Sequence, residues 1–139
     1  MSKTLFYRWF GLGGIPKNAK AQIQSEGIVL QDEGISGSIT FLKYRAPGRY
    51  HRWKRSWFSG SIALTKQHFL AFSGARTIIG VSWEHEKIHV LHALIEKQDT
   101  LRVDFDASIF DENASGDIEL RFSTPLAAEF LKQINRLTV

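Results

Sequence analysis

The stretch IELRFSTPLAAEFLKQINRL, residues 118–137, contains two hydrophobic periods in succession. Its first residues alternate between apolar and polar side chains, which is typical of a half-buried β-strand. Thr124 and Pro125 then form a helix-start signal, and apolar residues recur at spacings of three and four from Leu126 to Leu137. The stretch therefore predicts a strand that leads directly into one amphipathic C-terminal helix.

Further strands are expected upstream of this stretch. Residues 57–65 and 101–106 show the same alternation of apolar and polar side chains. Residues 68–73, 77–83 and 87–95 alternate less regularly but are rich in β-branched and aromatic residues. These five short segments follow one another at the close spacing that is typical of an all-β arrangement.

Two more apolar-rich segments, residues 27–33 and 38–44, are separated by Gly34-Ile35-Ser36-Gly37, which predicts a hairpin between two strands. Other turn signals are Ala46-Pro47-Gly48, Ser73-Gly74-Ala75 and Ser115-Gly116-Asp117. Seven or eight short strands followed by one helix predict a mainly β (α+β) fold. We expect an antiparallel β-barrel, or two orthogonal sheets, capped by the C-terminal α-helix.

A short helix is expected near the N-terminus. Pro16 is well placed as its first residue, the helix runs to about Gln24, and Gly27 is its stop. Residues 1–26 are then an aromatic segment and a short helix packed on a domain formed by residues 27–139. With 139 residues the whole chain is expected to be a single domain.

Composition indicates the compartment. With no cysteine, the chain has no disulfide, no thiolate metal site and no cysteine nucleophile, which suits a reducing compartment. No segment approaches the length of apolar sequence that a membrane span needs. We therefore expect a cytoplasmic protein that can lie peripherally at the inner face of the membrane. The aromatic run at residues 5–10 is interpreted as a cover for an exposed strand edge of its own domain, in preference to a membrane-interface segment.

The charge is unevenly distributed along the chain, whose net charge is +4. Between Ile35 and Trp83 there are eight basic residues and no acidic one. Between Glu84 and Glu119 there are ten acidic residues and three basic ones. Such a separation predicts a charge dipole, a property that bears on partners and association more than on fold.

The strongest candidate site is the run from Lys43 to Phe58, in which basic and aromatic residues are interleaved. Arginine presents a planar fork to phosphate, and tryptophan and tyrosine suit a membrane headgroup region or stack on a base. The mixture predicts an anionic partner, either an anionic membrane surface with its lipid headgroups or an acidic protein segment. The alternative is a solvated basic hairpin whose aromatic side chains pack on the barrel. The candidate ligand-binding residues are Lys43, Arg45, Arg49, Tyr50, Arg52, Trp53, Lys54 and Arg55.

Residues 60–72, GSIALTKQHFLAF, resemble the "G-x-I-x-L-T" strand and following hairpin of the pleckstrin-homology-like superfamily, in particular its bacterial and GRAM-like members. The strand at residues 116–122 and the segment WKRSWF at residues 53–58 extend the resemblance to roughly residues 27–137. The resemblance implies a barrel plugged by the helix, with headgroups or acidic peptides held at the open end. The final helix lacks the tryptophan usual in the eukaryotic domains, and the basic segment lacks the usual phosphoinositide spacing.

These features favour a non-catalytic binding module without a cofactor. A protein-interaction or self-assembly domain is the main alternative, because opposite charges on the two halves of the chain permit head-to-tail contacts and a homo-oligomer. Single-stranded nucleic-acid binding also fits the basic and aromatic mixture. The ten acidic residues of the second half make nucleic acid the less favoured partner. An enzyme ranks last, because no nucleophile elbow and no acid, base and nucleophile set can be assembled.

Two other patterns are interpreted as structural features and not as binding sites. His85, His89 and His92 lack a zinc-type signature such as H-E-x-x-H and are expected where a turn enters a strand, so no metal site is predicted. The glycines within residues 11–14 do not follow a strand with G-x-G-x-x-G spacing. They are interpreted as a flexible joint, not as a dinucleotide site.

Overall fold

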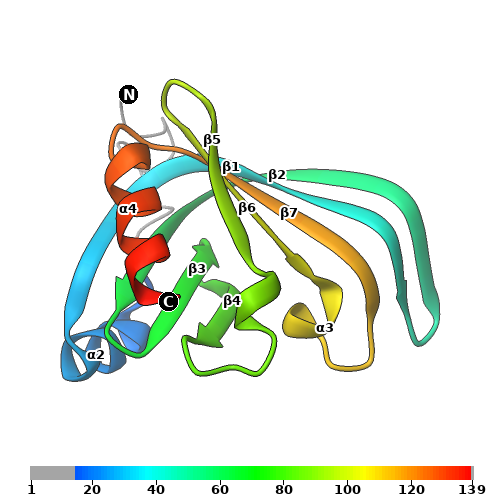
Figure 1. Cartoon of the computed structure of the whole chain (residues 1–139), viewed down its shortest axis with the longest axis horizontal. Coiled ribbons are helices and arrows are strands. Elements are labelled where there is room, and N and C mark those ends of the chain that lie inside the picture. The colour runs from blue at the N-terminus through cyan, green and yellow to red at the C-terminus, as the bar shows by residue number, and fades with distance from the viewer. Residues whose placement is uncertain (1–14, 139) are drawn as a thin grey trace.

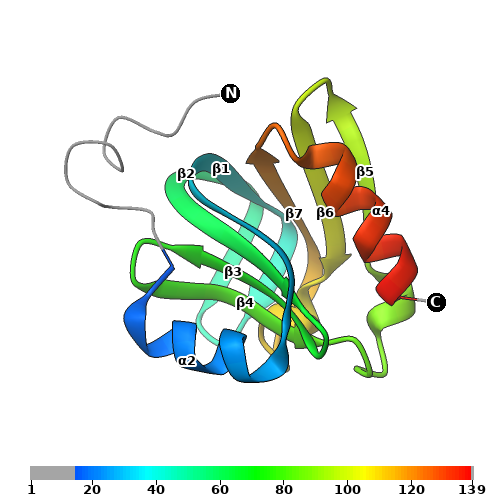
Figure 2. The same ribbon diagram turned by 90° about the vertical axis from the view of Figure 1, so that its left-hand side faces the viewer.

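The computed structural model describes residues 15–138 (Figures 1 and 2). These residues form one seven-stranded antiparallel sheet with the order β4-β3-β2-β1-β7-β6-β5. The strands are β1 (Ile28–Ala46), β2 (Arg49–Thr65), β3 (His68–Ser73), β4 (Arg76–Ser82), β5 (His92–Lys97), β6 (Thr100–Asp106) and β7 (Ser115–Ser123). The helices are α2 (Lys17–Glu26), α3 (Ala107–Phe110) and α4 (Ala127–Leu137), with a 3-10 turn, η1, at Ile88–Val90. The prediction of a mainly β fold with a C-terminal helix is confirmed.

The sheet is open, which corrects the expectation of a closed barrel. Within residues 15–138 its two edge strands are β4 and β5, which are not paired with each other. Residues 83–91 connect these edges, and Trp83 and Leu91 in this connection are buried in the core. Helix α4 contacts β5, β6 and β1 (Figure 2). The apolar face is therefore shielded by the connection and the helix, without hydrogen bonds between β4 and β5.

The predicted hairpin at residues 34–37 is wrong, because β1 is one continuous strand of 19 residues. Gly34, with φ +67°, lies at a shift in the β1–β2 register between Glu33 and Ile35, so it forms a bulge. Gly37 lies where a Cβ would be 2.6 Å from the Arg121 carbonyl oxygen and 2.7 Å from the Phe58 ring. Gly34 allows the bulge, Gly37 allows the close approach of Arg121 and Phe58, and neither glycine reverses the chain.

The predicted turn at residues 115–117 is also wrong, because these residues begin β7. The chain reverses just before them, through α3 and residues 111–114. Asp106 caps this short helix by accepting a hydrogen bond from the Ser108 N–H at 2.8 Å. By contrast, the predicted turns around Pro47-Gly48 and Gly74 are confirmed between β1 and β2 and between β3 and β4.

The two faces of the sheet are covered by different helices (Figure 2). On one face Phe130 and Ile134 of α4 are buried in the main core cluster, which also contains the alternating apolar residues of β6 and β7, as their periodicity predicts. On the other face Ile23 of α2 packs in a second cluster. The members of this second cluster are Ile15, Ile23, Ala63, Leu70 and Phe72. The predicted N-terminal helix is confirmed, with Pro16 and Gly27 as its caps.

Helix α2 is tied to the sheet by one carboxylate at its C-terminal end. Glu26 Oε1 accepts hydrogen bonds from Thr65 Oγ1 at 2.6 Å and lies 2.9 Å from His68 Nδ1. The Glu26 side chain is 8% exposed. Burial alone raises the pKa of Glu26, but hydrogen bonds from Thr65, Gln22 and His68 outweigh it and hold the pKa below the ordinary value of 4.5.

We expect the attachment of α2 to weaken in acid. Because the folded-state pKa of Glu26 is lowered, its stabilising effect is complete above pH 4.5 and is lost as the pH falls through the folded-state pKa. Glu26→Gln should reduce the free energy of unfolding by about 1–2 kcal/mol at neutral pH and by progressively less in acid. Urea titrations from pH 7 to pH 3 check this, with the exposed Glu86→Gln as the control. An equal loss at every pH would contradict the role of the Glu26 charge.

Candidate functional site

The β1–β2 hairpin extends beyond the rest of the sheet (Figure 1). Strand β3 pairs with β2 only along Gly60–Leu64, so among the described strands none lies on the outer side of residues 49–59. The last pair of the hairpin joins Ala46 to Arg49. The basic run is therefore carried by the paired ends of two strands, and only Pro47 and Gly48 form its turn. We call residues 43–58 the basic-aromatic hairpin.

Most of the predicted binding residues are exposed on this hairpin. Arg55 is the exception and is half-buried. Tyr50, Trp53 and Trp57 are 51%, 59% and 74% exposed, which is unusual for such large side chains. The exposed members of the predicted set are Lys43, Arg45, Arg49, Tyr50, Arg52, Trp53 and Lys54.

Arginines and aromatic rings pair with each other on the hairpin. The Arg45 guanidinium carbon lies 4.6 Å from the centroid of the Tyr50 ring. The Arg55 guanidinium carbon lies 5.4 Å and 5.8 Å from the ring centroids of Trp53 and Trp57. Cation–π contacts of this kind hold the aromatic side chains in place while their other faces stay exposed. The hairpin thus presents an ordered surface of guanidinium groups and rings.

The positive charge of the hairpin is not neutralised by the domain's own acidic half. Among residues 15–138, no acidic side chain forms an ion pair with a basic residue of the hairpin. Carboxylates of the second half instead pair with Arg102 of β6 and Arg121 of β7. The pairs are Arg102 with Glu96, Asp104 and Glu119, and Arg121 with Glu96 and Glu119, at 2.8–3.3 Å.

This network fixes the charge states on the β5–β6–β7 surface. The hydrogen bond from Arg121 holds the pKa of Glu96 below its ordinary value. Hydrogen bonds from the guanidinium to Asp104 raise the pKa of Arg102, and bonds to Glu96 raise that of Arg121. Among the described residues, Glu96, Asp104 and Glu119 of the acidic half are therefore paired with Arg102 and Arg121 and not with the cations of the hairpin.

A hollow of about 460 Å³ lies against the hairpin on the side of the β3–β4 turn. Arg49 and Lys54 of β2 and Arg76 of β4 line it, together with apolar side chains that include Phe41 and Ile78. Among the described residues, no carboxylate lines this hollow. Three cations around an apolar floor form a site suited to an anionic group attached to an apolar body.

Sequence reasoning missed Arg76 as a site residue. It lies more than 20 positions from Arg49 and begins an ordinary strand, so it carries no local motif. The antiparallel pairing of β2, β3 and β4 brings it to the hairpin. The signal that the sequence does contain is the absence of acidic residues from Ile35 to Trp83, a range that includes Arg76.

The other sequence patterns contribute no site in the part of the chain described. His85 Nδ1 accepts a hydrogen bond from the Lys87 N–H at 3.0 Å, and residues 15–138 contain no group of three or more side chains arranged to hold a metal ion. The glycines at 11–14 and the aromatic run at 5–10 lie outside the described residues. None of the described helices is long and apolar enough to cross a membrane.

Comparison with known proteins identifies no relative. No family model, no curated protein and no solved structure matches the chain.

Proposed function

We propose that this chain is a non-catalytic binding module of the pleckstrin-homology-like kind, which attaches to anionic membrane surfaces through the basic-aromatic hairpin. The antiparallel strand order, with a helix following the last strand, supports the likeness to that superfamily. The observation that carries the binding role is the hairpin itself. Its cations lack internal carboxylate partners among the described residues, and they stand beside three exposed aromatic side chains.

Exposed tyrosine and tryptophan favour a membrane over an acidic protein segment as the partner. Trp53, Trp57 and Tyr50 project from one strand next to arginine and lysine, which is the composition of a membrane–water interface. Each basic residue near an anionic bilayer contributes about 1 kcal/mol. The five exposed cations on the hairpin then supply on the order of 5 kcal/mol, which corresponds to weak and salt-sensitive attachment.

The test is a triple charge reversal, Arg49→Glu, Arg52→Glu and Lys54→Glu. All three side chains are exposed, so the fold should be unaffected. We expect binding to phosphatidylserine-containing vesicles to weaken by at least about 100-fold, because attraction at three positions becomes repulsion. Vesicle flotation with a series of lipid concentrations measures the change.

A matched control removes the same charge elsewhere. Lys17, Lys20 and Lys132 are exposed on α2 and α4, away from the hairpin. The triple reversal to glutamate at these three positions should keep most of the vesicle binding. Equal losses in both variants would show attraction by net charge alone and contradict a hairpin site. Binding to an acidic peptide but not to vesicles would replace the membrane by a protein partner.

A further inference from the structure

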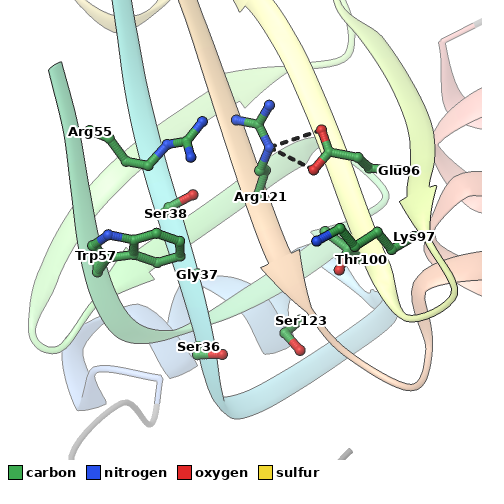
Figure 3. Close-up of a pocket in the computed structure, with 10 residues that line it drawn as sticks. All are labelled: Ser36, Gly37, Ser38, Arg55, Trp57, Glu96, Lys97, Thr100, Arg121 and Ser123. Carbon is green, nitrogen blue, oxygen red and sulfur yellow. Dashed lines mark hydrogen bonds and ion pairs between the residues drawn. The ribbon is translucent and has the colours of Figure 1, made fainter. Parts of the chain in front are cut away.

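A second hollow lies on the opposite face of the sheet from the main core (Figure 3). It has a volume of about 250 Å³ and crosses five strands, with Arg55 and Trp57 of β2 on one side and Glu96 and Lys97 of β5 on the other. Serines of β1 and Arg121 of β7 lie between them (Figure 3). We call this hollow the outer groove. It is a different hollow from the one lined by Arg49, Lys54 and Arg76, although Trp57 borders both.

A buried hydroxyl without a partner lies in the floor of the outer groove. Ser38 is 0% exposed, and its Oγ forms no hydrogen bond within the described structure. In the sheet register Ser38 is flanked by Trp57 on β2 and Arg121 on β7. A buried hydroxyl without a partner is unfavourable, so a ligand oxygen that accepts or donates a hydrogen bond here would satisfy Ser38.

Two guanidinium groups that line the groove meet at the hydroxyl of Thr40, two residues along β1 from Ser38. Arg55 Nε donates to Thr40 Oγ1 at 2.9 Å, and Arg121 donates through a terminal nitrogen to the same oxygen at 3.4 Å. Arg121 is balanced by Glu96 and Glu119, whereas Arg55 has no carboxylate partner among the described residues. The groove therefore keeps an uncompensated positive charge beside Ser38, which suits an oxyanion such as a carboxylate or a phosphate.

The rest of the groove suits a hydroxylated ring. The Trp57 side chain forms one wall and is 74% exposed, so it offers an aromatic face for stacking. Opposite it, Thr100 and Ser123 bring hydroxyl groups and Glu96 brings a carboxylate (Figure 3). These groups accept and donate hydrogen bonds to ring hydroxyls. At about 250 Å³ the groove is smaller than the ~300–1,000 Å³ of pockets for drug-sized ligands, which limits it to about one ring.

We propose that the outer groove binds an acidic sugar, a single hydroxylated ring that carries a carboxylate or a phosphate. The oxyanion lies between Arg55 and Arg121 and completes the hydrogen bonding of Ser38. The ring stacks on Trp57, and its hydroxyls meet the polar side chains of β5, β6 and β7. This site goes beyond the proposed membrane attachment and does not depend on it, although Arg55 and Trp57 belong to the basic-aromatic hairpin as well as to the groove.

Saturation-transfer NMR and isothermal titration with four probes test the proposal: glucuronate, glucose 6-phosphate, glucose and inorganic phosphate. We expect saturable binding of at least one acidic sugar, with glucose and inorganic phosphate each at least tenfold weaker. The two acidic sugars distinguish a carboxylate ligand from a phosphate ligand. Inorganic phosphate binding as tightly as the sugars would reveal a simple anion site and overturn the proposal, as would no saturable binding by any probe.

Variants locate the site. Trp57→Ala should weaken acidic-sugar binding at least tenfold. Trp53→Ala is the matched control, because Trp53 contacts Arg55 as Trp57 does but does not line the groove. Its acidic-sugar binding should be unchanged. Ser38→Ala removes an unpaired hydroxyl, so it should fold normally and bind about fivefold more weakly. Unchanged binding in both Trp57→Ala and Ser38→Ala would overturn the assignment. The Arg49, Arg52 and Lys54 triple reversal should keep sugar binding while it loses vesicles, which separates failure of this proposal from failure of the membrane role.

Discussion

Replacing Phe130 by alanine is expected to destabilise the protein by about 3–5 kcal/mol, as is typical of a fully buried phenylalanine. Phe130 is 0% exposed and belongs to the main core. It lies on α4, which contacts β5, β6 and β1. Its loss leaves a cavity at the place where the helix shields the open sheet. A change of this size is a large fraction of the roughly 5–15 kcal/mol that stabilises most domains.

Urea titrations of the wild type and the variant measure this loss. Phe130→Leu is the matched control, because it keeps most of the apolar volume and should cost much less. Leu131→Ala, at a half-buried position on the same helix, should also cost less than Phe130→Ala. If Phe130→Ala lost under 1 kcal/mol, α4 would not be a structural element of the core.

Gly60→Ala is expected to cost roughly 3 kcal/mol or more, although it adds only one methyl group. A Cβ at this position would lie 1.9 Å from the Phe72 carbonyl oxygen, which is backbone and cannot turn away. Gly60 is also paired on both sides, with Ile35 of β1 and Ser73 of β3. The sheet can admit the methyl group only if β2 and β3 separate at this point.

A second glycine provides the comparison. At Gly80 the nearest atom to an added Cβ is Leu70 Cδ2 at 3.1 Å, the end of a flexible side chain. Gly80→Ala should therefore cost less than about 1 kcal/mol. Thermal unfolding of both variants distinguishes the two positions. Similar losses at Gly60 and Gly80 would mean that the close β2–β3 approach is not as described.

The elements predicted correctly are those encoded by local periodicity. Leu101, Val103 and Phe105 alternate with polar residues, and the burial of β6 follows that alternation. The three- and four-residue spacing after Thr124 predicts α4 because only a helix brings those side chains to one face. Pro16 and Gly27 similarly define the ends of α2, since one suits a helix start and the other adopts φ +87°.

The elements predicted wrongly depend on distant parts of the chain. Gly34 and Gly37 have the composition of a turn, but pairing with β2 and β7 keeps β1 extended through both. Closure of the sheet was equally beyond a local pattern. Closure depends on whether β4 and β5 pair with each other. They do not, and residues 83–91 and α4 shield the apolar face instead.

The residues of the candidate sites also divide into those that a local sequence pattern identifies and those that it does not. The cations of the basic-aromatic hairpin are contiguous in sequence, so composition alone identified them. Arg76 and Arg121 reach the two hollows only through strand pairing, and no motif marks either residue. Ser38 was not predicted because an unpaired buried hydroxyl is visible only once its neighbours are placed.

Co-sedimentation of the wild-type protein with phosphatidylcholine vesicles, with and without phosphatidylserine, tests the membrane role most directly. The comparison is made at about 0.1 M and about 1 M salt, between which the Debye length falls from about 10 Å to about 3 Å. We expect the protein to pellet with phosphatidylserine-containing vesicles at low salt and to be released from them at high salt. It should not pellet with pure phosphatidylcholine vesicles at either salt concentration. Failure to pellet with anionic vesicles at low salt, or equal pelleting with both kinds of vesicle, would contradict attachment through the basic-aromatic hairpin.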